Sequence, residues 1–179
     1  MHGVIFTSFR DFLEAEHGSD IRAKVFEGEP FFLLSDAYPD ELLVTLLGKA
    51  AATTEQDAGD LLEAFGVFTA ARTFTRLYPA FFAVSRSARE FLLTVETRIH
   101  ELVRATIPNA APPQLNVTEL GVDRVEIVYS SSRRLCRLLR GLAEGTARHY
   151  GERTEITELT CMLRGDDACR FEITLVPNA

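Results

Sequence analysis

The sequence predicts an α+β fold, in which a helical N-terminal half packs on a small antiparallel sheet that carries one helix. Up to Ala105, apolar residues recur at steps of three and four, the spacing of helices. Beyond Pro108, Pro112 and Pro113 the pattern changes to the alternation typical of strands. The chain has 179 residues, 46% of them hydrophobic, which is enough for one core. We therefore expect a single domain over 1–179, with a helical part at about 1–65 and an α/β part at about 66–179.

Helical periodicity predicts the elements of the N-terminal half. Apolar side chains from Ile5 to Leu13 lie on one very aromatic face of the first helix. Pro39 with two acidic residues after it is typical of a helix start. The predicted helices lie at about 5–13, 19–26, 42–49, 54–65, 67–77 and 87–106.

Capping residues, glycine and proline set the expected helix boundaries. Thr54 with Asp57 resembles a loose capping box for the helix that follows. Gly66 is expected to break that helix. The Tyr78-Pro79 pair is expected to end the next one, because a proline disfavours a helical residue before it.

The C-terminal half is predicted to form a small antiparallel sheet with one helix. Its first two strands are expected to pair as a hairpin through 121–123, and Gly151 is expected to stop the helix. The predicted elements are strands at 114–119 and 124–129, a helix at 133–150, and strands at 155–163 and 168–176 about a turn at 164–167.

The charge balance excludes one class of partner. The chain has 19 basic and 26 acidic side chains, a net charge of −7. Such an acidic protein lacks the electrostatic attraction that holds nucleic acid or anionic lipid, so we expect neither nucleic acid nor membrane as a partner.

No apolar run approaches the roughly 20 residues that cross a bilayer. Arg10 and Asp11 interrupt the segment in which a signal peptide has its apolar run, so we expect a cytoplasmic protein.

Tyr129, Ser131 and Arg133 form a Y-x-S-x-R pattern where a strand leads into a helix. Positions two apart point the same way in an extended chain, so a phenol, a hydroxyl and a guanidinium can converge on one ligand. Arginine binds carboxylates with a planar fork, and the hydroxyls add donors. The trio suits a dicarboxylate. The alternative is a solvated strand end whose arginine pairs with an acid.

His100 is the second candidate. It lies at the margin of an apolar helical stripe that includes Leu92, Ile99 and Val103, and we expect it to be at least half buried. Imidazole is the usual axial ligand of heme iron. The alternative is a hydrogen-bonded core histidine that binds no metal.

In combination, these motifs resemble the heme nitric oxide/oxygen binding (H-NOX) domain family, which also includes the sensor of soluble guanylate cyclase. Four features match in order: the start at 1–5, the aromatic-proline segment at 74–82, His100 followed by Pro112-Pro113, and the Y-x-S-x-R motif. His100 lies 29 residues before Tyr129, with the proline pair between them. The resemblance covers essentially the whole chain and implies the H-NOX fold.

The resemblance implies a heme b cofactor. His100 is then the single protein ligand of the ferrous iron, and Pro113 presses on the porphyrin and distorts it. The implied holders of the heme propionates are Tyr129, Ser131 and Arg133. The implied wall residues are Ile5, Phe9, Phe74 and Leu142, although each is in general more typical of an ordinary core.

The resemblance also indicates which gas binds. Bound oxygen gains from a hydrogen-bond donor, whereas NO and CO need little such help. In oxygen-binding relatives a distal tyrosine lies nine residues after the first tyrosine of the motif, and Leu138 occupies that position here. Phe9 and Ala70 offer no donor either. We therefore expect a five-coordinate ferrous heme that binds NO and CO and excludes oxygen.

Cys136, Cys161 and Cys169 are the third candidate group. An odd number of cysteines without a secretory signal favours thiols or metal ligands over disulfides. Some NO-responsive relatives hold a structural zinc with three cysteines and one histidine, and Glu158 stands at the position of that histidine. Either Glu158 or His149 is the expected fourth zinc ligand. The alternative is three reduced cysteines that fill core space.

The resemblance implies a gas sensor, and the sequence contains no motif that indicates an enzyme. NO weakens the bond to His100, strain against Pro113 relaxes, and the helical half shifts relative to the sheet. The implied partner is a separate signalling protein, such as a histidine kinase or a cyclic-di-nucleotide enzyme. Two alternatives stay open: a zinc-thiolate redox sensor on the same scaffold, and a lipophile-binding domain of the 4-vinyl reductase type, which the segment 161–169 also resembles.

Overall fold

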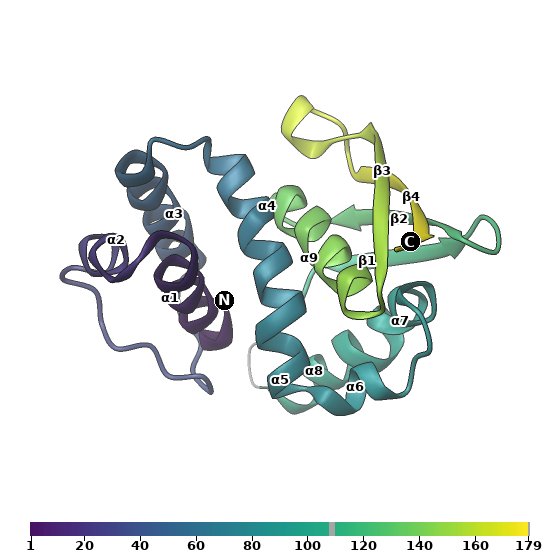
Figure 1. Ribbon diagram of the computed structural model, residues 1–179, viewed down its shortest axis with the longest axis horizontal. Coiled ribbons are helices and arrows are strands. Elements are labelled where there is room, and N and C mark those ends of the chain that lie inside the picture. Colours follow the sequence, from purple (N-terminus) through teal and green to yellow (C-terminus); the bar gives the residue numbers. More distant parts are fainter. Residues whose placement is uncertain (108–109, 179) are drawn as a thin grey trace.

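The computed structural model describes residues 1–107 and 110–178 and has the predicted α+β architecture (Figure 1). Helices α1 to α3 form a helical lobe, α4 borders it, and the sheet with α9 forms the other side of the molecule. The predicted fold class is therefore confirmed. Pro108, one of the prolines at which the sequence pattern changes, lies outside the described residues.

The N-terminal half is helical, as predicted. Its helices are α1 (Gly3–His17), α2 (Ser19–Val25), α3 (Asp40–Thr54), α4 (Ala58–Phe68), η1 (Thr69–Phe74), α5 (Thr75–Leu77), α6 (Pro79–Ala83), α7 (Ala88–Thr94), η2 (Val95–His100) and α8 (Glu101–Thr106). The segments η1 and η2 are π-helical, and each continues directly into an α-helix on both sides. Such segments are rare and often mark functional sites. Within the described ranges, no helix combines the length and apolarity that a membrane span requires.

Two predicted helix boundaries are wrong. Gly66 does not break a helix but lies inside α4, where a Cβ atom would come within 2.6 Å of the carbonyl oxygen of Leu138. Glycine is needed there because a neighbouring backbone passes too close for a side chain. Thr54 is the last residue of α3, and Asp57 alone caps α4 by accepting hydrogen bonds from two backbone N–H groups of the first turn.

The sheet has the strand order β1-β2-β4-β3, and each neighbouring pair is antiparallel. The elements of this half are β1 (Gln114–Glu119), β2 (Arg124–Ser130), α9 (Cys136–His149), β3 (Glu152–Thr160), η3 (Met162–Arg164) and β4 (Cys169–Pro177). The predicted hairpin of β1 and β2 is confirmed, and Leu115 lies opposite Tyr129 in it.

Two elements of this half have boundaries that differ from the prediction by three residues. The helix α9 starts at Cys136 rather than Arg133, because Arg134 has a left-handed backbone (φ 52°) that a helix interior excludes. The strand β3 covers 152–160 rather than 155–163, because the chain turns into η3 after Cys161. Cys161 therefore lies at the start of a turn.

The helix α9 lies between two hydrophobic cores. Leu139 and Ala143 pack with inward-facing side chains of the sheet, among them Phe171. Leu138 belongs instead to the core of the helical lobe, and Leu142 packs at the edge of that core. The aromatic face predicted for the first helix supplies Phe6, Phe9 and Phe12, which are buried in this second core. Because it takes part in both cores, α9 joins the helical lobe to the sheet.

Glycines allow α4 and α9 to pack backbone to backbone. A Cβ atom on Gly141 would overlap the carbonyl oxygen of Glu63, and one on Gly66 would lie 2.9 Å from the Cα of Gly141. The Glu63 side chain pairs with Arg137 and Arg140 of α9, at 3.1 and 3.4 Å. Because glycine has no side chain, Gly66 and Gly141 allow α4 and α9 to come this close.

Gly141→Ala is expected to lower the free energy of unfolding by about 1–3 kcal/mol or more, because both backbones at this contact are fixed by their cores. Urea denaturation measures this change. Gly48→Ala is the matched control: Gly48 lies exposed in α3, and a Cβ there meets no atom within 4 Å. The control should be neutral or stabilising by up to about 1 kcal/mol. Equal stability of both variants would contradict the close contact.

Candidate functional site

His100 is the last residue of η2, and its side chain is 15% exposed, so the predicted half-burial is confirmed. Its Nδ1 lies 2.9 Å from Oε2 of Glu96, one turn earlier in the same helix. A carboxylate that accepts the Nδ1 hydrogen leaves Nε2 with the lone pair that a metal needs. The contact with Glu96 therefore leaves Nε2 as the ring nitrogen that is available to a metal.

Glu96 is a site residue that the sequence reasoning missed. Besides His100, it accepts a hydrogen bond from the backbone N–H of Leu115, at 3.2 Å, and it pairs with the Arg104 guanidinium. The signal in the sequence was its i,i+4 spacing from His100, which brings two helical side chains together. Leu115 is the second residue of β1, so Glu96 ties the helix of His100 to the sheet.

Tyr129 and Ser131 lie close together where β2 turns toward α9. The Tyr129 side chain is 3% exposed, and its hydroxyl accepts a hydrogen bond from the N–H of Leu135 at 3.0 Å. Burial raises the pKa of Tyr129, and a hydrogen bond with Ser131 acts in the opposite direction. The Ser131 hydroxyl also accepts a hydrogen bond from the N–H of Arg133 at 3.3 Å. The structure therefore brings the two hydroxyls of the predicted trio together.

Arg133 pairs with an acidic residue in the structure, the arrangement that the sequence left open as the alternative to binding a ligand. Its Nε donates to Oδ2 of Asp40, the first residue of α3, at 2.6 Å, and its Nη1 donates to the carbonyl oxygen of Ala111. Burial alone would raise the pKa of Asp40, but the amino group of Met1 and the Arg133 guanidinium outweigh it and hold this pKa below its ordinary value. Asp40 lies 93 positions before Arg133, so no local pattern predicts the pair.

The segment 111–115 connects the two candidate regions. Arg133 holds it at Ala111, and Glu96 holds it at Leu115. Pro113 lies between these two bonds and is partly buried. The structure therefore places the predicted proline between the histidine helix and the Y-x-S-x-R turn.

Most of the predicted wall residues gather around the helical lobe. Phe9 is buried against Phe65, with ring centroids 5.0 Å apart, and it shares a core with Leu138. Ile5 and Leu142 are partly buried at the edge of this core. Ala70 is buried in η1. Each of these side chains is apolar, so none of them supplies a hydrogen-bond donor.

Phe74 lies apart from that core. It is the last residue of η1, partly buried, and its ring packs on Tyr78 at a centroid distance of 5.9 Å.

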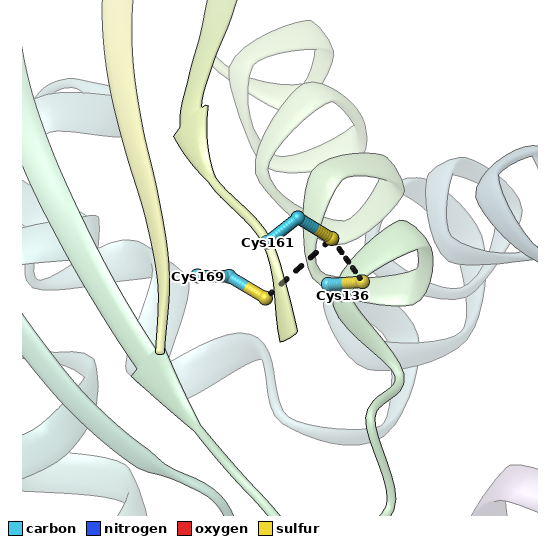
Figure 2. A group of neighbouring side chains, drawn as sticks. All are labelled: Cys136, Cys161 and Cys169. Atoms are coloured by element: carbon cyan, nitrogen blue, oxygen red, sulfur yellow. Dashed lines mark hydrogen bonds between the residues drawn. The ribbon is translucent and has the colours of Figure 1, made fainter. Parts of the chain in front are cut away.

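The three cysteines form one buried cluster, although they come from α9, the turn before η3, and β4 (Figure 2). Sγ of Cys161 lies 3.7 Å from that of Cys136 and 3.9 Å from that of Cys169. All three sulfur atoms lie within 4.8 Å of one another, a spacing that allows a shared metal ion. The predicted gathering of these residues is therefore present.

The structure does not bring either predicted fourth ligand to this cluster. The Glu158 carboxylate pairs with Arg164, which directs it toward the side of the 161–168 turn. His149 is the last residue of α9, whereas Cys136 is its first, so the two lie about 20 Å apart along the helix. The His149 ring packs on Phe82 at a centroid distance of 5.0 Å.

Comparison with known proteins places the chain among heme-binding domains. A family model described as Haem-NO-binding matches residues 2–158. Soluble guanylate cyclase 89Da of Drosophila melanogaster is 26% identical over 161 residues, which cover 84% of this chain and 23% of that protein. Soluble guanylate cyclase 89Db of the same organism is 24% identical over 143 residues, 74% of this chain and 20% of that protein. The chain thus spans less than a quarter of the length of these relatives.

Solved structures share the fold over the whole chain. An H-NOX protein from S. oneidensis in the Fe(II)NO ligation state has a TM-score of 0.90 at 24% identity, covering 98% of this chain and 99% of that one. An Fe(II) unliganded H-NOX protein from K. algicida has a TM-score of 0.85 at 25% identity, covering 99% and 98%.

The cysteine cluster predicts a pH dependence of stability in the metal-free protein. Burial raises the pKa of Cys136 from 9.0 to about 12, and it also raises the pKa of Cys169. The folded state therefore holds these protons more tightly than the unfolded state. Their contribution to stability is complete below about pH 9 and is lost as the pH rises toward 12. Urea denaturation across this range should show the loss, and Cys136→Ala should reduce it. An identical pH profile for both proteins would contradict the shift.

Proposed function

Because the chain belongs to the Haem-NO-binding family, we propose that it is a sensor domain that binds heme b and detects NO and CO. The family predicted from the sequence motifs is thereby confirmed. The observation that carries the proposal is the oriented imidazole of His100, whose Nδ1 is held by Glu96 and whose Nε2 is the ring nitrogen left for iron.

The residues of the Y-x-S-x-R motif suit the propionates of heme. A propionate is a carboxylate, and the Arg133 guanidinium binds the carboxylate of Asp40 at 2.6 Å, a contact that a propionate would share or replace. The Ser131 hydroxyl lies beside the backbone N–H of Arg133, the Tyr129 hydroxyl lies beside that of Leu135, and each hydroxyl has a hydrogen to donate. We assign the propionates to these three residues and contact with the macrocycle to Pro113.

Partly buried apolar side chains suit the faces of the macrocycle. Ile5 and Leu142 lie at the edge of the helical core and retain apolar surface that a flat ring would cover. Phe74 is partly buried in η1 and has the same role in the proposal. Phe9 is completely buried and supports these residues from within the core.

The three candidate distal residues are apolar, which favours NO and CO over oxygen. Ferrous heme, when bound, supplies an iron that accepts these gases as ligands. Phe9, Ala70 and Leu138 carry no hydrogen-bond donor, so they do not stabilise the polar oxygen complex. We therefore propose that the domain discriminates against oxygen because these side chains offer no hydrogen-bond donor to bound oxygen.

The contact of Arg133 with Asp40 supports signalling by a shift between the two parts of the domain. This ion pair joins the turn after β2 to the first residue of α3, in the helical lobe. A displacement of Arg133 on gas binding would therefore move α3 of the helical lobe through this ion pair. We propose that a separate cytoplasmic signalling protein, such as a histidine kinase or a cyclic-di-nucleotide enzyme, responds to that shift.

One observation favours a second candidate, a zinc-thiolate redox sensor: three buried sulfur atoms lie within 4.8 Å of one another. Zinc would bind the thiolates of Cys136, Cys161 and Cys169, and it would have to displace their protons. Metal analysis combined with an absorption scan distinguishes the candidates. Iron with a Soret band supports the heme sensor, and zinc without a Soret band supports the redox sensor.

His100→Ala tests the axial ligand. In the reduced, heme-loaded protein, this variant is expected to lose the wild-type Soret position and the change of spectrum on adding NO, because the iron loses its protein ligand. His149→Ala is the matched control, since its ring packs on Phe82 at the far end of α9. Wild-type spectra in His100→Ala would reject the assignment.

Leu138→Tyr tests the basis of gas selectivity. We expect the wild-type reduced protein to form no stable oxygen complex in air. In Leu138→Tyr, the tyrosine hydroxyl should slow oxygen dissociation by about tenfold relative to Leu138→Phe, the effect of one hydrogen bond of about 1.4 kcal/mol. Stopped-flow absorption measures the rate. Leu138→Phe controls for ring volume, because Leu138 is buried in the helical core. A stable oxygen complex in the wild type would contradict the proposal.

A further inference from the structure

The Glu96 side chain is held from three directions. Its Oε2 accepts from Nδ1 of His100 at 2.9 Å and from the backbone N–H of Leu115 at 3.2 Å, while its Oε1 pairs with Arg104. Its side chain is only 25% exposed. A carboxylate with these partners has a fixed rotamer, so the position of the imidazole is fixed with it.

A carboxylate on Nδ1 changes how an imidazole binds a metal. A histidine ligand usually donates its second ring N–H to another group, which orients the ring and raises its basicity. A carboxylate is a stronger acceptor than a neutral carbonyl or a water molecule, because hydrogen bonds to ionised groups are about twice as strong. Glu96 therefore makes Nε2 a stronger electron donor to whatever metal it binds.

The same carboxylate connects the imidazole to the proline segment. Leu115 follows Pro113 by two residues, and its N–H points at the oxygen that holds His100. Leu115 also lies opposite Tyr129 in the β1–β2 hairpin. Glu96 therefore places His100 relative to both Pro113 and the propionate-binding turn.

We propose that Glu96 is the positioning residue for His100: it orients the imidazole, strengthens the iron–histidine bond, and ties that bond to the strand that follows Pro113. This inference rests on the proposed heme function and adds a specific residue to it. The alternative role, a helix-surface ion pair with Arg104, would leave the iron–histidine bond unchanged.

An open cavity borders the Glu96 side chain. The cavity has a volume of about 660 Å³, and its lining includes Glu96, Arg104 and Leu115. Water from this cavity would reach Nδ1 in Glu96→Ala and would accept its hydrogen more weakly than the carboxylate does. In Glu96→Gln, the amide side chain keeps the shape of the carboxylate but carries no negative charge.

Resonance Raman spectroscopy of the reduced, heme-loaded full chain tests the proposal through the iron–histidine stretching band. We expect the frequency to fall in Glu96→Gln and to fall further in Glu96→Ala. Heme transfer to a scavenging apoprotein should become about ten- to a hundredfold faster in Glu96→Ala. Glu101→Gln, an exposed glutamate next to His100, is the matched control and should leave both quantities unchanged.

The outcomes separate this inference from the function on which it rests. A wild-type iron–histidine band that keeps its frequency in both Glu96 variants would overturn the role of Glu96 and leave the heme function standing. Absence of this band from the wild-type protein, or its persistence in His100→Ala, would overturn the heme assignment itself. A lower frequency in the Glu96 variants, with wild-type urea stability in Glu96→Gln, would establish the positioning role.

Discussion

Residues 111–115 are held at both ends, and the arrangement of the candidate site depends on this restraint. Arg133 binds the carbonyl oxygen of Ala111, and Glu96 accepts the N–H of Leu115. Glu96 also holds the imidazole of His100. Arg133 is itself the last residue of the Y-x-S-x-R motif and pairs with Asp40. Pro113 lies between these two hydrogen bonds in the chain. A movement of the helix that carries His100 or of the turn that carries Arg133 would therefore displace this proline.

Local patterns predicted much of the fold and part of the site. Periodicity identified the helix that carries His100 and the hairpin that carries Tyr129, because both depend on residues a few positions apart. Spacing around a turn also brought Cys161 near Cys169. The position of Glu96 was visible as an i,i+4 pair with His100, but acidic residues at that spacing are common on helices and do not select one partner.

Contacts between distant segments could not be predicted in this way. Asp40 pairs with Arg133 across 93 positions, and neither residue has a local feature that identifies the other. Gly66 looks like a helix breaker in sequence, yet it is required by the backbone of α9, a partner that only the folded chain brings close. The predicted fourth zinc ligand failed for a different reason: Glu158 pairs with Arg164, a nearby residue that spacing alone does not select as its partner.

A crystal structure of the reduced, heme-loaded protein tests the central claim most directly. We predict that the iron is bonded to Nε2 of His100, that Nδ1 of the same ring remains on Glu96, and that the propionates lie at Arg133. Iron bonded to another residue, or a heme that does not contact the segment 111–115, would contradict the assignment.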